Sequence, residues 1–233
     1  MSDVLPAAPP FLDRKQAGHE LAECLGSLAG KDDLVVVGLA PGGVPAAKEV
    51  ADALDAALDT MVVRPLVVPG PSELTVGAVT SAGTASVDLP AVKRYHLPSW
   101  AATYLAGVEQ EEAARLENIL RDHPTPPYLR GRTVVIVDDG LSSRDQIMAA
   151  TEEALGKQPA NVVVASPVMA TPVREELQGR GVEVDCLFDD EVERRGAGPF
   201  WYADATLPTP AEIRRLIGSA RQRWHWRDEV AKS

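Results

Sequence analysis

Two adjacent carboxylates at the end of an apolar run are the residues of this chain best suited to do chemistry. Asp138 and Asp139 follow the run Thr133-Val-Val-Ile-Val137 and precede Gly140. The run predicts a strand that is buried on both faces. Ligands of open parallel sheets bind beyond the carboxyl ends of the strands, so we predict a site at Asp138 and Asp139. The alternative is a plain strand-ending turn, which Asp and Gly also favour.

The segment after the carboxylates decides what such a site could hold. Leu141-Ser-Ser-Arg-Asp-Gln146 lacks the glycine and small residues of a phosphate-binding loop. Ser143 and Gln146 instead have the spacing of a capping box, in which both side chains satisfy amides at the start of a helix. No histidine or Gly-x-Ser-x-Gly motif lies near Ser142 or Ser143, so we predict no serine nucleophile.

Composition excludes several classes of function. The formal charge of -11 provides no basic field to attract nucleic acid. The two cysteines and four histidines lack metal-ligand spacing, so we expect free thiols and no metal centre. No apolar run reaches the roughly 18 residues that span a bilayer, and the N-terminal residues lack a signal pattern. We therefore expect a cytoplasmic protein without a membrane partner.

Strand-like and helical patterns alternate along the chain, which predicts an α/β fold with a parallel sheet covered on both faces. The expected strands are residues 34–39, 60–64, 133–137, 161–165 and 182–187. The expected helices are residues 13–28, 44–58, 99–121 and 210–223, with a helical piece near 172–178. Glycine and proline punctuate the β-prone pieces 74–79 and 84–89, which indicates a flexible hairpin or flap.

Five segments, in this order, carry a resemblance to a known family. They are Phe11-Leu-Asp-Arg14 with Ala17-Gly18, VVVGLAPGGVPAAKEVADAL, DTMVVRPLVVPGPSELTVGAV, LRGRTVVIVDDG and WYADATLPTPAEI. Together they resemble the type I phosphoribosyltransferases of the stand-alone bacterial kind. The resemblance implies a five-stranded parallel sheet flanked by helices, with a small hood and flap subdomain.

The same resemblance implies how the chain is divided. It implies one domain over residues 13–233, after a loose N-terminus of residues 1–12. The core would cover about 30–65 and 98–188, with a flap at about 66–97 and a hood from N-terminal and 189–209 segments. Aromatic residues 200–202 are expected to pack within the hood rather than stack on a base.

The implied activity is glycosyl transfer from phosphoribosyl pyrophosphate, with magnesium, in nucleotide metabolism. In that chemistry the acidic pair, Asp138 and Asp139, holds the ribose hydroxyls and stabilises charge on the sugar ring. The implied ribose- and phosphate-binding residues are Gly140, Ser142, Ser143, Arg144, Gly42, Gly43 and Arg64.

Departures from the family pattern cluster at positions meant for polyphosphate. Pro41 replaces an arginine and Pro65 a lysine in the pyrophosphate site, and Arg144-Asp-Gln146 replaces Gly-Ala-Thr in the phosphate loop. Each lost charge-assisted contact is worth about 1.5–3 kcal/mol. With the added negative charge of Asp145, the total loss exceeds about 4 kcal/mol, or roughly a thousandfold in affinity.

We therefore predict a phosphoribosyltransferase-like protein that is impaired in the use of phosphoribosyl pyrophosphate. It would keep a ribose- or nucleotide-binding crevice for a binding or regulatory role, with a small phosphosugar or nucleotide as partner. The alternative is an active, magnesium-dependent transferase in which Arg64 and Arg144 supply the charge at a remodelled phosphate site. A third hypothesis is an interaction module that uses the hood and the basic, aromatic tail 221–227. A homodimer, common in the resembling family, is left open.

Overall fold

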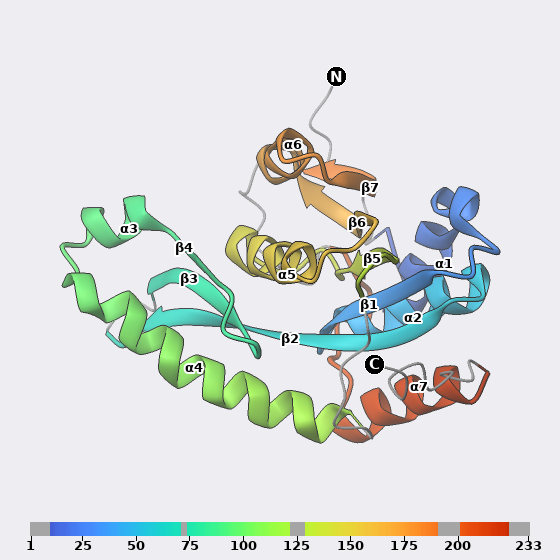
Figure 1. Cartoon of the computed structure of the whole chain (residues 1–233), viewed down its shortest axis with the longest axis horizontal. Helices are drawn as coiled ribbons and strands as arrows, with labels where there is room; N and C mark the ends of the chain where they lie inside the picture. The colour runs from blue at the N-terminus through green and yellow to red at the C-terminus, as the bar shows by residue number, and fades with distance from the viewer. Residues whose placement is uncertain (1–9, 71–73, 122–128, 191–200, 224–233) are drawn as a thin grey trace.

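A seven-stranded sheet runs through the molecule in the order β4-β3-β2-β1-β5-β6-β7 (Figure 1). The computed structural model describes residues 10–70, 74–121, 129–190 and 201–223. The strands are β1 (Leu34–Ala40), β2 (Ala57–Val68), β3 (Leu74–Thr80), β4 (Ala85–Val87), β5 (Thr133–Val137), β6 (Asn161–Ala170) and β7 (Glu183–Asp190). The helices are α1 (Arg14–Cys24), η1 (Gly26–Leu28), α2 (Gly43–Leu54), α3 (Leu89–Arg94), α4 (Ser99–Leu120), α5 (Arg144–Gly156), α6 (Thr171–Gly179) and α7 (Pro210–Arg223).

Five of the seven strands form the parallel core that the sequence predicts. β1 pairs in parallel with β2 and β5, and β6 continues the ladder from β5 to β7. The flap hairpin, β3 and β4, adds two antiparallel strands at the β2 edge. The sheet exceeds five strands because β2 is 12 residues long: its first half pairs with β1 and its second half with β3 (Figure 1).

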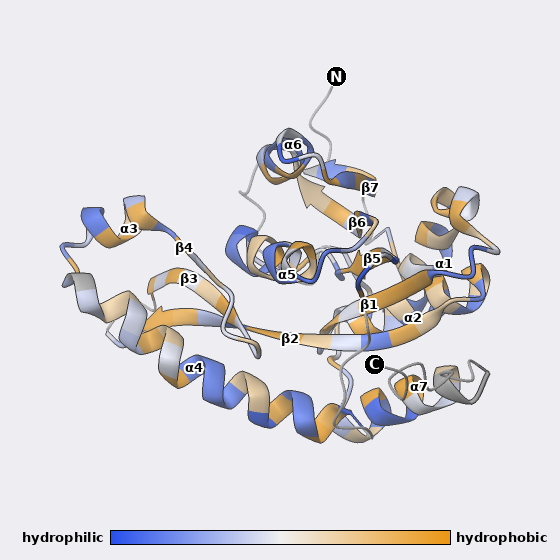
Figure 2. Cartoon of the chain, viewed as in Figure 1, coloured by the Kyte–Doolittle hydropathy of each residue, from blue (hydrophilic) through white to orange (hydrophobic). Residues whose placement is uncertain are grey.

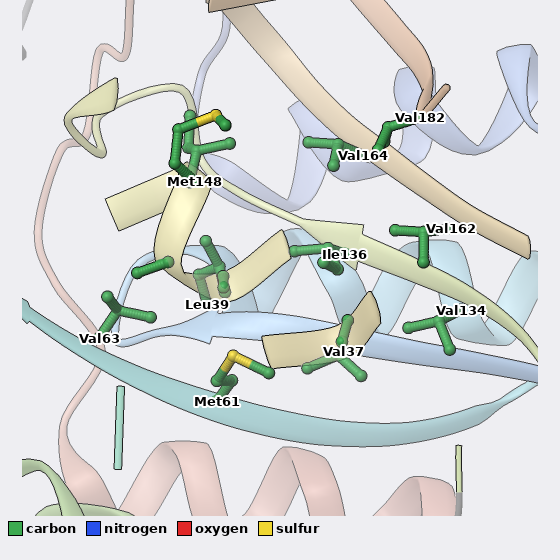
Figure 3. Packing of buried hydrophobic residues seen from close by; sticks show 14 of the residues in the cluster. Val37, Leu39, Met61, Val63, Val134, Ile136, Met148, Val162, Val164 and Val182 are labelled. Carbon is green, nitrogen blue, oxygen red and sulfur yellow. The ribbon is translucent and has the colours of Figure 1, made fainter. Parts of the chain in front are cut away.

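Apolar residues alternate along the central strands and so build one hydrophobic layer on each face of the sheet. On β5, Val134 and Ile136 pack with the layer under α5 and α6, which Figure 3 shows together with Met148. Val135 and Val137 pack with the opposite layer under α1 and α2. Full burial of one such side chain contributes about 1.5–3 kcal/mol. In Figure 2, β1 is largely hydrophobic, whereas α4 alternates between hydrophobic and hydrophilic residues along its length.

The second helix ends at Leu54, whereas its periodicity predicts an end at Leu58. Asp55 adopts a left-handed conformation with φ 52° and stops the helix. Leu58 instead lies in β2, where it pairs with Val36. The prediction is wrong because Leu54 and Leu58 are four residues apart and reach the same hydrophobic layer. Apolar spacing alone cannot separate a helix end from a following buried strand.

Phe11 and Leu12, at the end of the segment expected to be loose, make backbone contacts with residues 202–204. Phe11 is buried, and its backbone forms a bridge to Tyr202. The amides of Ala203 and Asp204 donate to the carbonyls of Phe11 and Leu12. The rings of Phe11 and Tyr202 also pack together, with their centres 5.8 Å apart. Residues 1–9 lie outside the described residues.

Several other features of the sequence predictions also fall on residues that the structure leaves undescribed. They include Phe200, most of the hood segment before residue 201 and the tail from residue 224 onward. Within the described ranges, no helix is both long and apolar enough to cross a membrane.

Candidate functional site

The acidic pair lies at the carboxyl end of β5, against the turn that joins β1 to α2. A Cβ atom on Gly42 would overlap Oδ2 of Asp139. A Cβ atom on Gly43 would lie 2.5 Å from the carbonyl oxygen of Val137. Both glycines are therefore needed for this turn to pack against the end of β5. Gly140, with φ 80°, then turns the chain away from the strand in a conformation that suits glycine.

Asp138 is buried and is held by the loop that follows it. Its Oδ2 accepts from the amide of Gly140 at 2.8 Å and from the amide of Ser142 at 3.4 Å, and its Oδ1 accepts from the Ser142 hydroxyl. Burial, and then the neighbouring charge of Asp139, raise the pKa of Asp138 to about 6 against the opposing effect of these bonds. Asp138 can thus change its charge just below neutral pH.

Asp139 is paired with a residue to which the sequence assigned no role. The buried guanidinium of Arg14, only 4% exposed, donates from Nε to Asp139 Oδ2 at 2.8 Å. The same guanidinium lies 5.1 Å from the ring centre of Tyr202, whose hydroxyl donates to the Asp139 carbonyl at 2.6 Å. Asp13 caps α1 and so fixes the start of the helix that carries Arg14. Arg14 therefore neutralises one member of the acidic pair.

Five of the amides that follow the acidic pair bond to side chains of the protein. The Gly140 and Ser142 amides donate to Asp138, and the Leu141 amide donates to Asp139 at 3.2 Å. The Ser143 amide donates to Gln146 Oε1 at 3.0 Å, and the Gln146 amide donates to Ser143 Oγ at 3.3 Å. The predicted capping box is therefore confirmed.

The basic residues expected to meet phosphate are already paired with carboxylates. Arg144 donates through Nε and Nη2 to Glu176 at 2.7 and 2.6 Å, and through Nη1 to Asp145 at 2.7 Å. The pKa of Glu176 is lowered chiefly by this contact. Arg64 donates to Glu109 of α4 at 2.6 Å. Arg64 thus reaches toward α4.

A cavity of ≈390 Å³ opens beside these residues, and we name it the Asp138 cavity. Its polar wall is Asp138, Gly140, Ser142, Ser143, Arg144 and Gln146, and its apolar wall is Leu141, Ile147, Val168, Met169, Ala170, Val173 and Trp201. The structure thus brings five predicted site residues into one lining, with Asp139, Gly42 and Gly43 packed behind them. Trp201 also packs on Phe188 of β7, with ring centres 6.0 Å apart, so it both packs against the sheet and lines the cavity.

The described residues do not offer a ready magnesium site. Among them, no three His, Cys, Asp or Glu side chains gather to hold a metal ion. Asp139 is neutralised by Arg14, and Asp138 accepts three hydrogen bonds from its own loop. Magnesium prefers several oxygen ligands in octahedral geometry, so a polyphosphate would have to supply most of them.

These features define an α/β protein with a cavity at the carboxyl end of a parallel sheet. A family model for the phosphoribosyl transferase domain matches residues 12–178. The chain therefore belongs to the phosphoribosyltransferase family.

Similar proteins agree with this assignment. Two Mycobacterium tuberculosis proteins, from strains CDC 1551 and H37Rv, are each 38% identical over 181 residues and carry provisional names as phosphoribosyl transferases. The match covers 76% of this chain, and the chain spans 40% of the length of these curated relatives. The crystal structure of TT1426 from Thermus thermophilus is 32% identical, with a TM-score of 0.67, and the match covers 89% of this chain and 97% of that one.

Proposed function

We propose that this protein is a phosphoribosyltransferase-fold binding protein with impaired use of phosphoribosyl pyrophosphate. It would hold a ribose- or nucleotide-type ligand in the Asp138 cavity, in a binding or regulatory role. One observation carries the proposal: the four consecutive amides from Gly140 to Ser143 all donate to side chains of the loop itself. Phosphate loops of α/β proteins work by presenting such amides to the ligand.

The charges around the cavity support the same conclusion. The charge of the Arg144 guanidinium is already shared between Glu176 and Asp145, so a phosphate would compete with two carboxylates for it. Arg64 is engaged by Glu109, and prolines stand at two positions where the family pattern has basic residues. Each charge-assisted contact that has to be broken before a phosphate binds makes the free energy of binding less favourable by about 1.5–3 kcal/mol.

The ribose-binding half of the site supports retained binding. Asp138 lies in the cavity wall, where the remaining lone pairs of its carboxylate would accept from sugar hydroxyls, and Trp201 and Val168 add apolar surface to the same lining. A cavity of ≈390 Å³ falls within the usual range of about 300–1,000 Å³ for small-molecule sites.

The second candidate is an active phosphoribosyltransferase with a remodelled phosphate site. The family membership favours it, and so does the raised pKa of Asp138, because perturbed carboxyls cluster at active sites. In this case Arg144 would leave Glu176 when the substrate binds.

A restored loop distinguishes the two candidates. The triple variant Arg144→Gly, Asp145→Ala, Gln146→Thr returns the loop to the family pattern. Titration calorimetry with phosphoribosyl pyrophosphate and Mg²⁺ should give no saturable binding to the native protein below millimolar concentration and measurable binding to the variant. Micromolar binding to the native protein, or pyrophosphate release with a panel of bases that Asp138→Asn abolishes, would establish the enzyme instead.

A further inference from the structure

We propose that the Asp138 cavity selects uncharged nucleosides over their phosphate esters. This inference rests on the proposed function, because it assumes that the ligand occupies this cavity. It goes further in naming the ligand class: a nucleoside whose ribose meets Asp138 and whose base lies against the wall containing Trp201.

Carboxylates dominate the charge around the cavity. Among the described residues of the lining, Arg144 is the one that is basic, and it is shared between Asp145 and Glu176. Arg14, behind the lining, is taken by Asp139, and Asp138 adds a further carboxyl group. Arg180 on the outer side of Glu176 is itself paired with Glu152. A phosphate ester would therefore bring its negative charge to a site whose one described cation, Arg144, is already balanced by two carboxylates.

Asp145 places its negative charge where a phosphate would need positive charge. It lies in the first turn of α5, and its Oδ1 accepts from Ser86 of the flap strand β4 at 2.9 Å. Arg144 donates to the same oxygen. With these two donors, the nearly buried carboxylate is fixed at the helix terminus, where it offsets the favourable dipole that would otherwise attract an anion.

A nucleoside avoids these unfavourable contacts and keeps the favourable ones. Its ribose hydroxyls would donate to the carboxyl group of Asp138, which lines the cavity. Its base would lie against Val168, Met169, Val173 and Trp201. Flat, partly apolar bases bury well against such a surface, and aromatic contact adds to area burial. The cavity thus provides for a sugar and a base without provision for a phosphate.

The experiment compares matched pairs by titration calorimetry at pH 7.5: adenosine with AMP, guanosine with GMP, and uridine with UMP. We expect at least one nucleoside to bind at least about tenfold more tightly than its monophosphate, a difference of about 1.4 kcal/mol. The variant Glu176→Gln releases one partner of Arg144 and should raise monophosphate affinity about fivefold or more while leaving nucleoside affinity within twofold. Glu175→Gln makes the same chemical change at the neighbouring exposed position of α6 and should alter neither by more than twofold.

The outcomes separate this inference from the proposed function. The inference is overturned if no nucleoside binds at least about tenfold more tightly than its own monophosphate, or if no nucleoside binds at all up to millimolar concentration. Equal effects of Glu176→Gln and Glu175→Gln would also overturn it, because the response would not depend on Arg144. Micromolar binding of phosphoribosyl pyrophosphate to the native protein would overturn the proposed function itself.

Discussion

Replacement of Arg14 should destabilise the protein strongly. The substitution Arg14→Met keeps an unbranched side chain of similar length but leaves Asp139 buried and without its guanidinium partner. Breaking a buried ion pair from one side costs about 3–5 kcal/mol, a large part of a typical total stability of about 5–15 kcal/mol. For a domain of this size, that corresponds to a fall in Tm of roughly 10 °C.

The assay is urea unfolding followed by circular dichroism at pH 7.5. Lys15→Met, at the exposed neighbouring position of α1, is the matched control and should change the free energy of unfolding by less than about 0.5 kcal/mol. The double variant Arg14→Met, Asp139→Asn should recover about 2 kcal/mol or more, because the unpaired charge is gone. A loss below about 1 kcal/mol for Arg14→Met, without coupling to Asp139→Asn, would refute the role given to this pair.

Two other predictions concern the acidic pair and the glycine turn beside it. The pKa of Asp138 is raised to about 6 from an ordinary value of 3.8, so its contribution to stability is present below about pH 4 and lost as pH rises through 6. Between pH 4 and pH 8, the free energy of unfolding of Asp138→Asn, measured by urea titration, should therefore rise by on the order of 2–3 kcal/mol relative to that of the native protein. A difference in unfolding free energy that does not change with pH would contradict this. Gly42→Ala should cost about 1–3 kcal/mol, because its Cβ would overlap Asp139. Gly179→Ala, whose Cβ would meet nothing within 4 Å, should be neutral or stabilising by up to about 1 kcal/mol, and equal losses for the two variants would count against the packing explanation.

Local patterns predicted much of the fold and part of the site. The valine-rich run before Asp138 is a buried strand, as predicted, because its apolar β-branched residues and the turn residues that follow it indicate the same element. Ser143 and Gln146 form the predicted capping box because the interaction spans three residues and needs no tertiary contact. The wrong prediction of the helix end at Leu58 shows the limit of such patterns. Where a strand directly follows a helix, the first buried residues of the strand can continue the apolar spacing of the helix.

Long-range contacts explain what could not be predicted. Arg14 is 125 residues from Asp139 in sequence, and no spacing rule connects them. The only signal was that Arg14 belongs to one of the segments that carry the family resemblance. Likewise, the pairing of Arg144 with Glu176 depends on how α6 packs beside α5. The contact of Arg64 with Glu109 on α4 also joins distant parts of the sequence, and no local pattern predicts it.

We conclude that the loop after the acidic pair stabilises its own helix, with the amides of residues 140–143 bonded to Asp138, Asp139 and Gln146 rather than presented to a sugar phosphate. A crystal soaked in ribose 5-phosphate tests it most directly. We expect the amides of residues 140–143 to keep Asp138, Asp139 and Gln146 as acceptors, with no phosphate density against them. A phosphate bound to those amides, with the Ser143 cap broken, would contradict the claim.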